Sequence, residues 1–185
     1  MNKLFVIAAL AVSLVSGSAY AGEVSGEVRM GDFVFRHPQY AAYKVEAWDS
    51  VGPAAFGGEI NTKQNSKHTT TDTKVSVKSG MILPEMEKVK SVVYGEYGKN
   101  LSSIKDYDFW GLGAKFKVPV YGPVSLDAGY RHRQSFGGSL LREDRFNAGL
   151  SYALAKDTSV GAMYYHSIGT GRNDDSVGLN FTKSF

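Results

Sequence analysis

The feature that most constrains this chain is a regular alternation of apolar and polar residues. Residues 109–118 (FWGLGAKFKV) place five apolar side chains on one face, while glycine and lysine occupy most of the other. The segments 124–133 (VSLDAGYRHR) and 145–154 (RFNAGLSYAL) repeat this pattern. Because successive side chains of a β-strand point to opposite faces, the alternation predicts strands that lie between apolar and polar surroundings.

The length of these segments helps to separate a membrane barrel from a soluble sheet. After residue 22 no stretch holds the roughly eighteen consecutive apolar residues that a transmembrane helix requires, so only strands could cross a membrane. The strands of a soluble sandwich or a lipocalin-like barrel also alternate apolar and polar residues. Segments of about ten residues, however, suit a tilted transmembrane strand better than a soluble one. A soluble periplasmic β-protein stays an alternative, because the segments before residue 100 alternate less cleanly.

The last ten residues carry the most specific motif. The segment 176–185 (SVGLNFTKSF) places Val177, Leu179, Phe181 and the final Phe185 on one face. It resembles the C-terminal strand of small bacterial outer-membrane β-barrel proteins of the porin-like superfamily. The resemblance implies that Phe181 and Phe185 form the signal that the barrel-assembly machinery recognises. Lys183 departs from the apolar pattern, at a cost of only about 0–1 kcal/mol near the membrane edge.

The turns predict an all-β fold, an antiparallel up-and-down transmembrane β-barrel of ten strands, with eight and twelve as alternatives. Short connections at 49–53, 83–87, 119–123 and 155–158 alternate with longer ones at 33–39, 64–71, 99–106, 135–143 and 168–174. This is typical of short periplasmic turns and longer extracellular loops, and an even strand number returns both termini to the periplasm. The expected strands are 23–32, 40–49, 54–63, 72–83, 87–98, 107–118, 123–134, 144–154, 158–167 and 175–185.

Residues 1–21 have the three parts of a secretory signal peptide. Lys3 gives a positive start, Leu4–Val15 is apolar, and Ala19-Tyr20-Ala21 offers small residues at the cleavage site. We expect cleavage after Ala21, which leaves 22–185 as one barrel domain in the cell outer membrane. Cysteine is absent, so packing and backbone hydrogen bonds must hold this domain together.

The alternation also assigns side chains to the two faces of the barrel. Aromatic rings prefer the headgroup level of a membrane, so outward aromatics predict two girdles. They are Tyr43, Tyr97, Trp110, Tyr130, Phe146, Tyr152, Tyr164 and Phe181. Charged residues belong in the lumen, where opposite charges pair and a basic excess favours anions. The candidate lumen charges are Arg29, Lys44, Glu46, Lys115, Lys117, Asp127, Arg131 and Arg133.

These features predict an integral outer-membrane protein that is a narrow porin-like channel or a binder for small anionic solutes. The alternative is a surface-exposed interaction protein, an adhesin, receptor or exclusion factor, with a plugged barrel and no transport. Outer-membrane lipids, lipopolysaccharide and the barrel-assembly machinery are the other expected partners. The net charge of +3 is spread along the chain, which gives no footprint for nucleic acid.

No enzymatic activity, metal or cofactor is expected. The four histidines fall in predicted loops or at the outer rim, without a metal-ligand partner at short spacing. His166 and Ser167 are neighbours in one strand and therefore point to opposite faces, which makes them poor catalytic partners.

Overall fold

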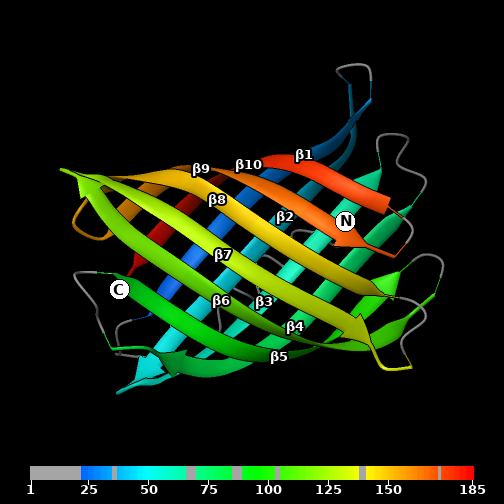
Figure 1. The fold of residues 1–185 in the computed structure, drawn as a ribbon, viewed down its shortest axis with the longest axis horizontal. Coiled ribbons are helices and arrows are strands. Elements are labelled where there is room, and N and C mark those ends of the chain that lie inside the picture. Colours follow the sequence, from blue (N-terminus) through cyan, green and yellow to red (C-terminus); the bar gives the residue numbers. More distant parts are fainter. Residues whose placement is uncertain are drawn as a thin grey trace, which may run out of the picture.

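The computed structural model describes residues 22–34, 37–65, 70–84, 89–102, 105–137, 141–170 and 172–185. They form a closed antiparallel barrel of ten strands, which confirms the predicted fold (Figure 1). The strands are β1 (Glu23–Val34), β2 (His37–Val51), β3 (Ala54–Asn65), β4 (Thr71–Ile82), β5 (Lys90–Ser102), β6 (Tyr107–Tyr121), β7 (Val124–Ser135), β8 (Arg142–Ala155), β9 (Thr158–Gly169) and β10 (Arg172–Ser184). The described residues contain no helix long and apolar enough to cross a membrane. The predicted signal peptide, residues 1–21, lies outside the described residues.

Each strand pairs with its neighbours in sequence, and β1 pairs with β10 to close the ring. At the closure Gly26 lies opposite Phe181, and the backbone N–H of Phe185 donates to the carbonyl oxygen of Gly22 at 2.9 Å. The closed ring leaves no open sheet edge, so backbone groups along the strands are paired with neighbouring strands. Such a wall can lie in a medium without water.

The two ends of the barrel differ. The turn end carries Gly22, Phe185 and the turns 52–53, 122–123 and 156–157; the opposite end is called the loop end below. Gly52 and Gly122 have φ values of 59° and 53°, and each precedes a proline. A positive φ at the first central position is the pattern of a type II′ hairpin turn, which matches the twist of the two strands.

The expected contrast between long and short connections is wrong in part. Strands extend into the predicted loops, so that only residues 35–36, 66–70, 103–106, 136–141 and 170–171 remain between strands at the loop end. The connection 83–89 at the turn end is longer than any of these. The fifth strand was expected at 87–98 but runs from Lys90 to Ser102. Residues 99–102 all pair with β4, and Lys99 and Asn100 also pair with β6, so backbone pairing continues the strand where the side-chain pattern fades.

The outward face is apolar between the two ends. On β8, for example, Leu150 is 55% exposed and lies across from Leu126 of β7 and Ala162 of β9. The ring of Phe146 lies nearer the loop end of the same strand and that of Tyr152 nearer the turn end. Leu150 is therefore placed near the middle of the apolar band.

This placement predicts the effect of a charge at that position. Leu150→Arg should destabilise the barrel by about 2–4 kcal/mol, the cost of arginine near the bilayer midplane. Leu150→Met, which keeps an apolar side chain of similar volume, should fold like the parent. Urea unfolding of the protein refolded into lipid vesicles measures both. Equal stability of the two variants would mean that this face does not meet lipid.

Candidate functional site: the charged barrel interior

The interior contains all eight of the charged residues that the sequence assigned to the lumen. Arg29, Glu46, Arg131 and Arg133 are buried there. The others line a cavity in the interior: Lys44, Lys115, Lys117 and Asp127. They come from β1, β2, β6 and β7, whose inward-facing positions alternate with apolar outward ones.

Two glutamates near the centre of the barrel hold most of the cations together. Glu46 accepts hydrogen bonds from Lys78 at 2.5 Å and from the indole N–H of Trp48 at 2.9 Å. The ammonium group of Lys115 lies 2.7 Å from the same carboxylate. Glu59 accepts from Lys78 at 2.6 Å and from Arg131 at 3.1 Å. Buried charges require such partners, because an unpaired ion in the interior costs several kcal/mol.

Arg133 closes the interior toward the loop end. Its guanidinium donates two hydrogen bonds to Glu96, from Nε at 2.5 Å and from Nη2 at 2.8 Å, and a third to Glu59 at 3.0 Å. The guanidinium also lies 4.9 Å from the ring centre of Phe109, a side chain with 0% exposure. These side chains fill the lumen at this level.

The Arg133–Glu96 pair can form because the strand between them carries a glycine. Glu96 of β5 and Arg133 of β7 both lie opposite Gly111 of β6. A Cβ at Gly111 would lie 2.5 Å from Oε1 of Glu96 and 2.6 Å from the carbonyl oxygen of His132. The absent side chain leaves room for the two charged groups to meet over β6.

A cavity of about 480 Å³ occupies the turn-end part of the lumen. Arg131, Lys78 and Tyr165 lie at its inner limit, and Lys90 and Glu23 lie near the turns. Phe109, Arg133 and Glu96 close the lumen toward the loop end, and they are not among the described residues that line this cavity. The interior thus has a closed loop-end part and a hollow turn-end part.

The charges that remain accessible in the cavity are mainly positive. The side chains of Lys115 and Lys117 are each 41% exposed, whereas those of Glu46 and Glu59 are 2% exposed. Asp127 is 23% exposed and pairs with Lys117 at only 3.8 Å. An ion that enters the cavity therefore meets ammonium groups first.

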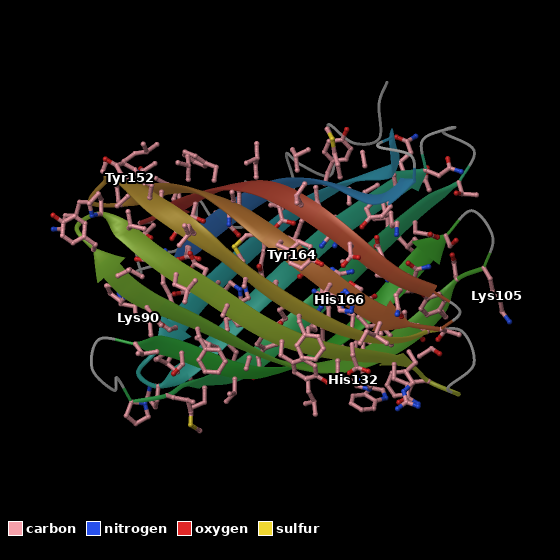
Figure 2. All side chains as sticks on the ribbon, turned by 45° about the horizontal axis from the view of Figure 1, so that its top comes forward. Lys90, Lys105, His132, Tyr152, Tyr164 and His166 are labelled. Atoms are coloured by element: carbon pink, nitrogen blue, oxygen red, sulfur yellow. The ribbon has the colours of Figure 1, made fainter. Side chains whose placement is uncertain are left out.

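The outward aromatics lie at different depths. Figure 2 shows Tyr152 near the turn end, Tyr164 further along, and His132 and His166 nearer the end where Lys105 lies. The predicted girdle residues are exposed except Trp110, which is half-buried with its ring centre 5.5 Å from that of His132. The exposed ones are Tyr43, Tyr97, Tyr130, Phe146, Tyr152, Tyr164 and Phe181.

The end of the C-terminal strand β10 combines exposed aromatic rings with one charged residue. Phe181 and Phe185 are exposed on the outward face. Lys183, the residue that breaks the apolar pattern, donates a hydrogen bond to Asp157 in the turn between β8 and β9. The hydrogen bonds from Lys183 and Thr158 lower the pKa of the Asp157 carboxyl group. The lysine is thus accommodated by an acidic partner at the edge of the wall.

Several interior residues were not predicted from the sequence. Arg145 and Glu143 of β8 point inward and pair at 2.5 Å, and Tyr40 donates to Asp174 at 2.6 Å. Continuing the β8 alternation from Gly149 through Asn147 would have identified Arg145 and Glu143. The outward face has two similar clusters near the loop end, in which a tyrosine and a histidine share one aspartate. They are Tyr130, His132 and Asp144, and Tyr164, His166 and Asp175.

The described residues include no group of three or more His, Cys, Asp or Glu side chains that could hold a metal ion. His166 bonds to Asp175 on the outward face, whereas Ser167 bonds to Arg145 on the inward one. The two neighbours are therefore separated by the barrel wall, as strand geometry requires.

A closed barrel with an apolar exterior, aromatic rings near both ends and a charged interior defines an outer-membrane β-barrel protein. A family model described as "Gram-negative porin" matches residues 16–176. The chain belongs to this Gram-negative porin family, and its location is the outer membrane. Short turns are typical of the periplasmic side of such barrels, so we expect the turn end to face the periplasm.

This chain is similar to several solved structures, of which the first described here shows the fold. The β domain of the Bordetella autotransporter BrkA has a TM-score of 0.56 and 12% sequence identity, over 91% of this chain and 100% of that one. The KdgM porin in complex with oligogalacturonate has a TM-score of 0.49 and 8% sequence identity, over 88% of this chain and 99% of that one. A loop-deletion mutant of Vibrio cholerae OmpT has a TM-score of 0.46 and 12% sequence identity, over 86% of this chain but only 62% of that one. This chain thus spans less than two thirds of the Vibrio protein. No curated protein matches its sequence.

The buried Arg133–Glu96 pair predicts a strongly non-additive effect of mutation. Arg133→Ser and Glu96→Ser should each destabilise the barrel by about 3–5 kcal/mol, because each leaves a buried charge without the main partner of its ion pair. The double variant should lose less than the sum of the two. Urea unfolding in detergent micelles measures the cycle, with Lys183→Gln as a control in which an exposed ion pair is removed at little cost. Additive losses would contradict the pairing.

Proposed function

We propose that this porin-family protein is a narrow, anion-preferring outer-membrane barrel that admits small anionic solutes to its lumen. The observation that carries the proposal is the difference in exposure between Lys115 or Lys117 and the carboxylates Glu46 and Glu59. Membership of a porin family points to a channel rather than to an enzyme.

The geometry favours anions in two ways. The ammonium groups stand in a narrow lumen with low-dielectric walls, which concentrates their field on the solvent that remains. The carboxylates already accept several short hydrogen bonds, so they have little capacity left for an incoming cation. Six cations, Arg29, Lys44, Lys78, Lys115, Arg131 and Arg133, surround four carboxylates, Glu27, Glu46, Glu59 and Glu96. In this group the excess of positive charge favours anions over cations from solution.

The closing group at the loop end makes the passage narrow. Phe109 and Arg133 leave almost no exposed surface at their level, so any open pathway past them is small. We therefore expect a low conductance that rises when the closing side chains are shortened.

The alternative, a surface interaction protein, needs binding surface outside the membrane. The strand bounds leave only short connections at the loop end, of which 136–141 is the longest. The interior cavity offers more developed chemistry than these connections do, which favours the solute-binding proposal. Contacts of the outward face with lipopolysaccharide, and with the barrel-assembly machinery at the C-terminal strand, are further proposals.

The first test is the reversal potential of the refolded mature chain in a planar bilayer under a salt gradient. The parent should prefer anions. Lys117→Gln should reduce the ratio of anion to cation permeability by about fivefold, which corresponds to the loss of roughly 1 kcal/mol of attraction in a hydrated lumen. Lys99→Gln removes the same charge from the outward face and should leave the ratio unchanged. A cation-preferring parent would overturn the proposed selectivity.

The second test concerns the proposed assembly signal. Deletion of Phe185 removes the terminal aromatic ring, together with the backbone N–H that donates to Gly22. Phe185→Ala removes only the ring. If the ring is the recognised feature, both variants should accumulate poorly in the outer membrane, measured by membrane fractionation and by the gel shift of heated and unheated samples. Normal levels of Phe185→Ala would mean that the ring is not the recognised feature, and low levels of the deletion variant alone would then point to the backbone bond.

A further inference from the structure

The turn-end cavity has two walls of different chemistry, formed by strands on opposite sides of the ring. β5 and β6 contribute lysines, namely Lys90, Lys115 and Lys117. Five steps around the barrel, β10 and β1 contribute neutral hydrogen-bonding groups beside the charged residues Glu23, Glu27 and Arg29 of β1. The neutral groups are Ser25, Asn180 and Thr182. A molecule that spans the cavity therefore meets ammonium groups on one side and hydroxyl or amide groups on the other.

The lysine wall contains an unfavourable arrangement. Lys90 and Lys117 are directly opposite each other in the pairing of β5 with β6, and both line the cavity. Like charges directly opposite in an antiparallel pair are destabilising. Lys115 lies two residues from Lys117 and faces the same space. The wall holds three positive charges within a short distance.

Carboxylates on the chain compensate these charges only in part. Lys115 has a close partner, Glu46, at 2.7 Å, but Asp127 is 3.8 Å from Lys117. Within the part of the chain that the structure describes, Lys90 makes no ion pair. An external anion between Lys90 and Lys117 would remove the repulsion, and this repulsion is the observation that points to a ligand.

The charge of the ligand follows from the spacing. Cα atoms of directly opposed residues in an antiparallel pair are about 4.5–5.5 Å apart, so two ammonium groups can approach one anionic group together. A single carboxylate neutralises one of them. A phosphate monoester, with a charge of about −1.5 to −2 near neutral pH and three acceptor oxygens, can neutralise both. Lysine is also a common phosphate-binding residue.

The opposite wall specifies the remainder of the ligand. Serine and threonine hydroxyls and the asparagine amide donate and accept hydrogen bonds, which suits a molecule rich in hydroxyl groups. On the same side Glu27 is already engaged by Lys44 and Tyr165, while Glu23 at the rim offers further acceptor oxygens for hydroxyls. The cavity of about 480 Å³ is within the usual size of small-molecule sites, about 300–1,000 Å³.

We propose that the turn-end cavity is a binding site for a small polyhydroxylated phosphate monoester of the sugar phosphate class. Lys90 and Lys117 hold the phosphate, and the β10–β1 wall holds the hydroxyl groups. The inference rests on the proposed function, which it makes specific. Because Arg133 and Phe109 fill the loop-end part of the lumen, this site opens toward the periplasmic end.

Isothermal titration calorimetry of the refolded mature chain in detergent micelles tests the site, with glucose 6-phosphate as the probe. We expect saturable binding of one molecule per barrel. Gluconate, a hydroxylated anion with a single charge, should bind at least about tenfold more weakly, and glucose should not bind. Inorganic phosphate should bind, but more weakly than the sugar phosphate. Absence of saturable binding, or equal affinities for glucose 6-phosphate and gluconate, would overturn the proposal.

Variants separate the site from general effects of charge. Lys90→Gln and Lys117→Gln should each weaken glucose 6-phosphate binding by about tenfold, whereas Lys99→Gln on the outward face should not change it. Without ligand, Lys90→Gln should unfold at a higher urea concentration than the parent, because it relieves the repulsion with Lys117. Weaker binding together with higher stability cannot result from misfolding. A Lys90→Gln variant that binds like the parent would exclude Lys90 from the site.

The two proposals fail in different experiments. If the bilayer shows anion preference but calorimetry shows no binding of glucose 6-phosphate, the sugar phosphate site is wrong and the proposed function stands. If glucose 6-phosphate binds but the bilayer shows no preference for anions, the site stands as a binding site in a barrel that does not conduct them.

Discussion

The structure depends on one constraint, which is that the bilayer interior offers no water to the backbone. Every N–H and C=O group in that region has to find a partner within the chain. This protein meets the requirement by pairing β1 with β10, and the last residue continues the closure through the hydrogen bond from Phe185 to Gly22. Once the ring is closed, each strand has one face toward lipid and one toward the lumen. The placement of every other side chain follows from that division.

Closure also sets the chemistry of the interior. Charged residues cannot face lipid cheaply, so they gather in a lumen that ten strands make narrow. Confined there, they have to pair, and some of the pairs reach across the barrel. Arg131 of β7, for example, binds Glu59 of β3, a residue 72 positions away in sequence. The same pairing leaves Lys115 more exposed than Glu46 and Glu59, so the pairs that stabilise the interior are also those behind the proposed preference for anions.

The sequence predicted the parts of this fold that depend on local alternation. The period of two identified the strands and the face to which each of Lys115, Asp127 and Arg131 belongs, because neither property needs knowledge of a partner. It misplaced β5, where pairing with β4 and β6 extends the strand beyond its own pattern. It could not predict the contacts of Arg133 with Glu96, since these depend on strand register and on the glycine between them. The unequal exposure of lysines and glutamates was also hidden, because it depends on contacts between residues of different strands.

The two-faced wall has a consequence for how such chains change over time. A single-residue insertion within a strand would exchange the lipid-facing and lumen-facing sides of all the residues that follow in that strand. Replacement of one apolar residue by another of any shape has little effect on the outward side. The fold therefore constrains spacing more strictly than residue identity. A chain can thus cover 91% of its length with the fold of the BrkA β domain while sharing 12% of its residues with it.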